Sequence, residues 1–182
     1  KTIRAVEEPD KRFAEDALRI LRAIRFSAQL GFEIDKNTYE SMKRNANLVK
    51  NVSYERIRDE LCKLLMTNSP MSGLVVAHET GVLGIILPEV VAGMGVSQNQ
   101  AHSFDVWEHN LRTLQHAADK NWPLELRLSA LLHDVSKPET RRFSREKGDY
   151  TFYGHDVVGG RVAREIMIRL KFPSTIVDYV SL

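Results

Sequence analysis

Several features that are common in proteins are scarce or absent here, and each absence excludes a class of structure or of function. Cys62 is the single cysteine, so no internal disulfide can form, which fits a reducing, cytoplasmic compartment. No apolar run approaches 18 residues, so we expect no membrane span. The net charge is only +2, so charge alone should bind RNA weakly. The start has neither Met nor an apolar leader, so we expect a piece of a longer protein.

The rest of the composition is that of a globular chain, with 43% hydrophobic and 27% charged residues. Charge is unevenly spread, because Glu79 and Glu89 are the only charged residues between Met71 and Ala101. Near Gly93–Gln100, glycines are followed by small polar residues, a pattern that predicts a domain boundary. We therefore expect two domains, residues 1–95 and residues 96–182.

Apolar residues recur at helical spacing along most of the chain. In segment 13–30 they predict one amphipathic helix that ends at Gly31: Phe13, Ala17, Leu21, Ile24 and Ala28. The same reasoning predicts helices over residues 35–48, 54–66, 72–80, 107–118, 124–133 and 155–170, and it leaves 82–87 undecided between helix and strand. Residues 142–143 and 150–153 flank Lys147-Gly148-Asp149, which predicts a small hairpin. The expected fold class is all-α, with little or no sheet.

Four charged residues fall on one face of the first predicted helix: Arg12, Asp16, Arg19 and Arg22. Asp16 and Arg19 are neighbours at i,i+3 on that helix. A carboxylate beside a guanidinium places acceptors next to a fork of donors, which can read the edge of a nucleobase. The same charges suit a salt-bridged, solvated helix face, so spacing alone leaves both interpretations open.

The sequence around these residues resembles the class II tRNA nucleotidyltransferases, which are the CCA-adding enzymes and the related bacterial poly(A) polymerases. From Arg12 it reads RFAEDALRILRAIRF, similar to that family's EDxxRxxR motif, then LGFEID from Leu30 and YERIRDEL from Tyr54. The resemblance covers residues 3–92. It implies a helical neck and RNA-binding domain, with CTP, ATP and tRNA or another RNA 3′ end as partners. In that domain Asp16 and Arg19 would bind the base, and Arg12 and Arg22 would support the pocket or contact phosphate.

The catalytic carboxylates of this family are absent from the sequence. Nucleotidyl transfer in that family uses Mg²⁺ held by a DxD pair of carboxylates in a head domain, and the 182 residues contain no DxD. We therefore expect a headless fragment that does not transfer nucleotides by itself. The motifs present do not distinguish CCA addition from poly(A) addition.

Histidine and aspartate residues form a second constellation in the C-terminal half. His133-Asp134 closes an apolar predicted helix, His109 lies on the helix before it, and His155 follows in a Gly-His-Asp sequence. Imidazole and carboxylate groups on adjacent helices can converge on a divalent metal. The set resembles the HD phosphohydrolase superfamily, whose pattern is His…His-Asp…Asp.

This second resemblance implies a helical, metal-dependent domain that binds Mn²⁺, Mg²⁺, Ni²⁺ or Fe²⁺. By that resemblance His109, His133 and Asp134 are the first three ligands, and His155 matches a recurrent element of such domains. Lys137 matches a basic residue near the substrate phosphate. Asp178 is the only acidic residue after Glu165 and is one candidate for the last ligand, the alternative being a residue beyond position 182.

Three functions follow from these observations. The leading one is the base-selecting and RNA-binding part of a tRNA nucleotidyltransferase. The alternative is an HD phosphatase or 2′,3′-cyclic phosphodiesterase acting on nucleotide or RNA-end phosphates, and the third is a non-catalytic RNA- or protein-binding module. A basic loop suits either phosphate contact or a solvated hairpin: Arg141, Arg142, Arg145 and Lys147. The sequence leaves open whether the chain forms a homo-oligomer.

Overall fold

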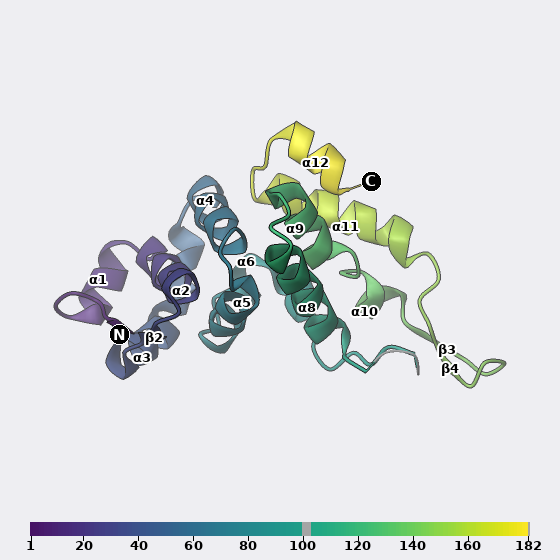
Figure 1. The fold of residues 1–182 in the computed structure, drawn as a ribbon, viewed down its shortest axis with the longest axis horizontal. Coiled ribbons are helices and arrows are strands. Elements are labelled where there is room, and N and C mark those ends of the chain that lie inside the picture. The colour runs from purple at the N-terminus through teal and green to yellow at the C-terminus, as the bar shows by residue number, and fades with distance from the viewer. Residues whose placement is uncertain (100–102, 182) are drawn as a thin grey trace. The chain divides into compact units, whose positions relative to one another are not determined.

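A computed structural model describes residues 1–99 and 103–181, which are mostly helical, so the predicted all-α class is confirmed (Figure 1). The chain divides into two compact units, Lys1–Ile86 and Leu87–Leu182. This division lies before residues 93–100, where the sequence predicted the domain boundary. Residue 100 of that range lies outside the described residues. Residues 93–96 join the second unit because the amides of Trp107 and Val106 donate to the carbonyls of Gly93 and Val96.

The first unit is a set of short helices with a two-residue parallel strand pair that the sequence analysis did not predict. Strands β1 (Thr2–Ile3) and β2 (Glu33–Ile34) pair in the register Thr2 to Glu33. The helices are α1 (Pro9–Glu15), α2 (Leu18–Leu30), α3 (Lys36–Asn45), the 3-10 helix η1 (Ala46–Asn51), α4 (Tyr54–Leu65), α5 (Pro70–Glu79) and α6 (Leu83–Ile86). Segment 82–87, undecided from sequence, thus contains a short helix.

The predicted single helix over residues 13–30 is wrong, because the chain leaves the helical conformation at Asp16. Asp16 is extended, with φ −154° and ψ 101°, and it separates α1 from α2. Its Oδ1 accepts a hydrogen bond of 3.1 Å from the amide of Leu18 and so satisfies a free donor at the start of α2. Periodicity missed the break because Phe13, Ala17 and Leu21 are buried on both sides of it.

Helix α2 is the centre of the first unit, since it packs against α4 and α5. Its apolar face is buried, and it ends as predicted at Gly31, whose φ of 65° suits glycine. A buried ion pair also joins α2 to α4: Arg25 Nε donates to Glu60 Oε2 over 2.8 Å, with side-chain exposures of 12% and 7%. Asp35 caps α3 by accepting from the amide of Thr38 over 3.2 Å.

The second unit is built on the packed pair α8 (Val106–Asp119) and α9 (Leu124–Leu132). Asp105 caps α8 by accepting from the amide of Glu108 over 2.7 Å. The remaining helices are α7 (Pro88–Val91), α10 (Lys137–Thr140), α11 (His155–Arg169) and α12 (Ser174–Val180). Helix α12 packs on both α9 and α11. The short helices α7, α10 and α12 were not predicted.

The predicted hairpin is present in the second unit. Strands β3 (Arg142–Ser144) and β4 (Asp149–Thr151) pair antiparallel, with Phe143 opposite Tyr150. The turn between them contains Gly148 at a φ of 61°. Among the described residues, no helix is both long enough and apolar enough to cross a bilayer.

The close packing of α5 against α2 and α4 generates a stability prediction. A Cβ at Gly73 would lie 2.4 Å from Leu64 Cδ1 and 3.1 Å from Ala28 Cβ, and Leu64 is itself only 3% exposed. Gly73→Ala should therefore lower the free energy of unfolding by about 1–3 kcal/mol, because buried neighbours must shift. Urea unfolding followed by circular dichroism measures this change.

Gly84→Ala is the matched control, since Gly84 is also helical and a Cβ there meets no atom within 4 Å. We expect that variant to be as stable as the parent or more stable by up to about 1 kcal/mol. Equal unfolding midpoints for the two variants would contradict the packing described for Gly73.

Candidate nucleotide-binding and metal sites

In the first unit, Glu15 holds two of the predicted nucleotide-binding arginines together. Its Oε2 accepts from Arg12 Nη1 over 2.8 Å and from Arg19 Nη1 over 2.6 Å. Arg19 Nη1 also donates to the carbonyl of Arg12 over 2.8 Å, so this guanidinium bridges the end of α1 and the start of α2. The two arginines are thus fixed in place before any ligand arrives.

Asp16 has a different partner from the one its spacing suggested. Its Oδ2 accepts a 2.8 Å hydrogen bond from Arg56 Nη2 on α4, while Arg19 donates to Glu15. The hydrogen bond from Arg56 lowers the pKa of the Asp16 carboxyl below its ordinary value, against the opposing effect of burial. The carboxylate is therefore held charged at the helix break.

Four arginines, Arg4 and the three predicted ones, line one small cavity in this unit. Arg12, Arg19 and Arg22 surround a space of about 240 Å³, together with apolar side chains that include Phe13 and Phe26. Guanidinium groups beside aromatic rings offer both charge and a stacking surface. The structure thus gathers three of the four predicted residues around a cavity and places Asp16 at the adjacent helix break.

Sequence reasoning did not assign a role to Arg56. It belongs to the YERIRDEL segment that carried part of the family resemblance, but it lies 40 positions from Asp16. No periodicity within a helix connects residues at that separation. The packing of α4 against α2 brings the pair together.

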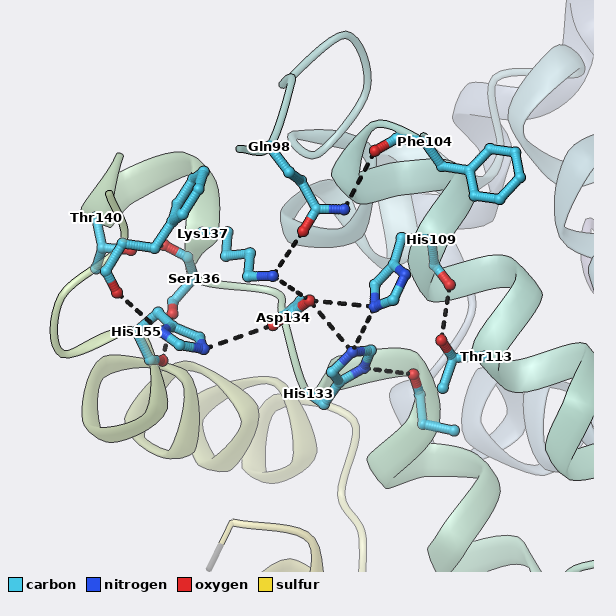
Figure 2. Close-up of polar contacts among 12 residues, drawn as sticks. Gln98, Phe104, His109, Thr113, His133, Asp134, Ser136, Lys137, Thr140 and His155 are labelled. Carbon is cyan, nitrogen blue, oxygen red and sulfur yellow. Dashed lines mark hydrogen bonds and ion pairs between the residues drawn. The ribbon is translucent and has the colours of Figure 1, made fainter. Parts of the chain in front are cut away.

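In the second unit, four elements bring charged and imidazole groups to one point (Figure 2). His109 lies on α8, His133 ends α9, Asp134 lies in the turn that follows, and Lys137 begins α10. Figure 2 shows His109, His133 and Lys137 directed toward the Asp134 carboxylate. The arrangement depends on the α8–α9 packing, which brings the first two rings to 5.1 Å between their centres at a tilt of 59°.

Three ligand atoms lie close together in this cluster. His109 Nε2 is 3.1 Å from His133 Nε2, and these nitrogens are 3.4 Å and 3.2 Å from Asp134 Oδ2. Ligand atoms about 2.0–2.2 Å from one ion are themselves roughly 3 Å apart. Two imidazoles and a carboxylate are a donor set for a divalent transition metal. Among the residues described, this is a group of side chains that can hold a metal ion.

The hydrogen bond to Nδ1 of His133 decides which nitrogen of this ring carries the proton. His133 Nδ1 lies 2.9 Å from the carbonyl of Ala130, and a carbonyl can only accept, so Nδ1 carries the proton. Nε2 therefore faces the cluster, where the neutral ring can offer a lone pair to a metal ion and the protonated ring can donate to Asp134. A shared proton or a metal ion between these three atoms offsets their mutual repulsion. The donor set therefore fits a metal ion.

Asp134 is the most buried member, with 4% of its surface exposed. Burial alone would raise the pKa of its carboxyl, but hydrogen bonds from His133 and Lys137 and the charge on these groups hold that pKa well below its usual range. Lys137 Nζ lies 2.7 Å from Asp134 Oδ2 and also donates to Gln98 Oε1 over 2.6 Å. Lys137 is thus a fixed positive charge behind the carboxylate.

The two remaining candidates have different outcomes. His155 Nε2 lies 3.7 Å from Asp134 Oδ1, and its Nδ1 is held 2.8 Å from the carbonyl of Phe152, so His155 faces the other carboxylate oxygen. Asp178 is not brought to the cluster, because the exposed carboxylate accepts from Arg164 Nη1 over 2.8 Å. Asp178 therefore does not supply the final Asp ligand of the His…His-Asp…Asp pattern in this structure.

Comparison with known proteins matches each half of the chain to a described family. Residues 31–94 match the probable RNA and SrmB-binding site of polymerase A, and residues 106–181 match the HD domain. These regions contain α4, which supplies Arg56, and the α8–α9 pair, which supplies His109 and His133.

Curated relatives match over nearly the whole chain. A CC-adding tRNA nucleotidyltransferase of Thermus thermophilus is 38% identical over 177 residues, which are 92% of this chain and 40% of that protein. An A-adding tRNA nucleotidyltransferase of Deinococcus radiodurans is 34% identical over 180 residues, 95% of this chain and 41% of that protein. The chain thus spans about 40% of the length of these relatives.

Solved structures share the fold at lower identity. A Thermotoga maritima CCA-adding enzyme complexed with tRNA matches with a TM-score of 0.59 and 18% identity, over 98% of this chain and 37% of that one. Over nearly all of its length the chain is therefore homologous to part of the tRNA nucleotidyltransferases, and its two halves match the polymerase A family region and the HD domain in that order.

Proposed function

We propose that the first unit selects CTP and ATP and helps to hold the RNA 3′ end in a tRNA nucleotidyltransferase. The observation that carries this proposal is the cavity lined by Arg12, Arg19 and Arg22, beside an Asp16 carboxylate that Arg56 keeps charged. The names of the relatives support the nucleotide class, since one adds C and the other adds A.

Base selection follows from the hydrogen-bonding capacity of Asp16 and Arg19. Cytosine and adenine both present an exocyclic amine beside a ring nitrogen acceptor, whereas uracil and guanine present a carbonyl at the amine position. Asp16 has lone pairs beyond those used by Arg56 and Leu18, so it can accept from the amine and repel a carbonyl. Arg19 uses Nη1 in its described contacts, so its other donors can reach the ring nitrogen.

The remaining arginines suit the triphosphate. Arg12 and Arg22 line the same cavity as Arg19 and carry permanent charge, so they can contact phosphate oxygens while Asp16 and Arg19 face the base. Transfer itself requires Mg²⁺ and a carboxylate pair of the DxD type, which these 182 residues do not contain. Those groups would be contributed by residues outside this sequence.

We further propose that the second unit is a divalent-metal phosphohydrolase that acts on nucleotide or RNA-end phosphates. The observation that favours it is the convergence of His109 Nε2, His133 Nε2 and Asp134 Oδ2, a set of ligand atoms suited to a divalent metal. Mn²⁺, Fe²⁺, Ni²⁺ and Mg²⁺ are the candidate ions, with the imidazoles favouring the first three. When bound, such an ion polarises a phosphoester and makes a bound water a stronger nucleophile.

The protein residues around the cluster have separate tasks in that chemistry. Ala130 fixes the ring of His133 through its carbonyl, and Phe152 does the same for His155. Lys137 places a positive charge next to Asp134, where it can attract the phosphate of a substrate. Exposure of His133 keeps the cluster open to solvent and to ligands.

The nucleotide-selection proposal predicts a change in fidelity when Asp16 loses its charge. In the full-length protein, Asp16→Asn should lower the preference for CTP and ATP over UTP by about tenfold or more, because an amide can donate to the carbonyl that a carboxylate repels. Incorporation of each nucleotide into tRNA lacking its 3′ end measures this preference.

Asp59→Asn is the matched control, because Asp59 is an exposed carboxylate on α4 paired with Arg58. We expect that variant to keep the parental preference. Unchanged selection in Asp16→Asn would refute the base-reading role of Asp16.

The metal proposal predicts that Asp134→Asn weakens binding of Mn²⁺ or Ni²⁺ by more than about 100-fold. Changes to residues that merely orient metal ligands cost about 10–100-fold, so loss of a charged ligand should cost more. Titration calorimetry with each metal measures the affinity, and phosphate release from nucleotides measures the accompanying activity.

Asp178→Asn serves as the control, since the Asp178 carboxylate pairs with Arg164 and lies outside the cluster. That variant should bind metal as the parent does. Equal loss in both variants would show that the cluster is incomplete without Asp178, and no loss in Asp134→Asn would reject the site.

A further inference from the structure

A hollow of about 630 Å³ lies beside the metal cluster, between the β3–β4 hairpin and the start of α11. Its volume falls within the roughly 300–1,000 Å³ of small-molecule sites. The residues that line it and matter here are Lys137, Lys147, Tyr150, Tyr153, His155 and Asp156. Neither the metal chemistry nor the nucleotide selection proposed above uses this space.

The hollow and the metal cluster share two side chains. Lys137 Nζ lies 2.7 Å from one oxygen of Asp134, and His155 Nε2 lies 3.7 Å from the other, while both residues also line the hollow. Figure 2 shows Lys137 and His155 approaching Asp134 from the side away from His109. A ligand in the hollow can therefore place one group at the cluster and extend the rest toward the hairpin.

The hairpin end of the hollow offers aromatic rings and a cation. Tyr153 is 73% exposed, and its hydroxyl lies 2.9 Å from Lys147 Nζ, which also sits 5.3 Å from the Tyr153 ring centre. Tyr150 is covered by the Arg141 guanidinium at 3.4 Å. Tyr153 thus presents a ring to solvent that the protein core does not use, and every nucleobase can stack on such a ring.

The charges around the hollow argue for a ligand with a single phosphate. Lys137 and Lys147 are opposed by Asp149 and Asp156 on the same walls. A lining that carries positive and negative charges suits a ligand with one phosphate and several uncharged polar groups better than a polyphosphate, whose charges are all negative. Carboxylate oxygens can accept from ribose hydroxyls or a base amine, while Lys137 attracts a phosphate at the cluster end.

We propose that this hollow seats a nucleoside monophosphate, with its phosphate at the Asp134 cluster and its base stacked on Tyr153. The ligand is either a free nucleotide or the terminal nucleotide of an RNA strand, since both present the same chemistry. Tyr153 is then the residue that makes the second unit specific for nucleosides over other phosphate esters. This inference rests on the phosphohydrolase function proposed for that unit.

The test is a nuclear magnetic resonance titration of the ¹⁵N-labelled, metal-free chain with AMP and with ribose 5-phosphate, which lacks the base. Amide signals of the hairpin and of the start of α11 report on the hollow, separately from the cavity in the first unit. AMP should bind at these signals more tightly than ribose 5-phosphate. Tyr153→Ala should weaken AMP about tenfold, since one stacked base contributes that much, and leave ribose 5-phosphate within about twofold.

Tyr179→Ala is the matched control, because Tyr179 on α12 is also exposed, at 52%, and does not line the hollow. That variant should bind AMP as the parent does. Equal affinities for AMP and ribose 5-phosphate, or an AMP affinity that survives Tyr153→Ala, would overturn the proposal. A short RNA that binds more tightly than AMP in a Tyr153-dependent way identifies an RNA end as the ligand, and the reverse identifies a free nucleotide.

The two proposals for this unit fail in different ways. If Mn²⁺ binds and phosphate esters are hydrolysed without any preference for the base, the hollow has no nucleoside role and the phosphohydrolase proposal stands. If AMP binds through Tyr153 while the chain binds no metal, the hollow is supported and the phosphohydrolase proposal is rejected.

Discussion

The buried carboxylate of Asp134 is the interaction on which the second unit depends. It lies in the turn between α9 and α10, and it contacts His109 on α8, Lys137 on α10 and His155 on α11. A buried charge without partners would cost several kcal/mol, on the order of the stability of a whole domain. The elements around it are therefore constrained to supply cations or ring nitrogens, and the same requirement creates a metal-binding geometry. The burial of the Asp134 carboxylate thus accounts both for the packing of these elements and for the clustering of ligand atoms.

The first unit uses a carboxylate in a related way at its helix break. Asp16 satisfies the start of α2 through Oδ1 and receives Arg56 through Oδ2, so the break and its orientation are both determined by one side chain. Because a carboxylate can accept about four hydrogen bonds, these two leave capacity for a ligand. Arg19 is fixed by Glu15 on the other side of the break. A fixed acceptor beside fixed donors is what discrimination between bases requires, since mobile groups would adapt to either base.

The two proposals assign nucleotide ligands of different charge to the two units. The cavity with four arginines suits a nucleoside triphosphate, whereas the hollow beside Asp134 has balanced charge and suits a single phosphate. The two cavities differ in the charge of the side chains that line them. The first has no carboxylate among its lining side chains, and the second has Asp149 and Asp156. Under the two proposals, the first unit would select nucleotides for transfer and the second would cleave phosphate esters.

The sequence by itself determined the helical class, the helix end at Gly31 and the hairpin, because caps, turns and periodicity are local. It also singled out His133 and Asp134 as candidate ligands, because imidazole and carboxylate are metal-ligating groups. Tertiary structure decided the rest. The break at Asp16 lay hidden under continuous burial of Phe13, Ala17 and Leu21. Arg56 reaches Asp16 only because α4 packs on α2, and Asp178, chosen from its place in the chain, pairs with Arg164 instead. Ion pairs between distant segments follow from helix packing, which hydrophobic spacing does not encode at the level of single side chains.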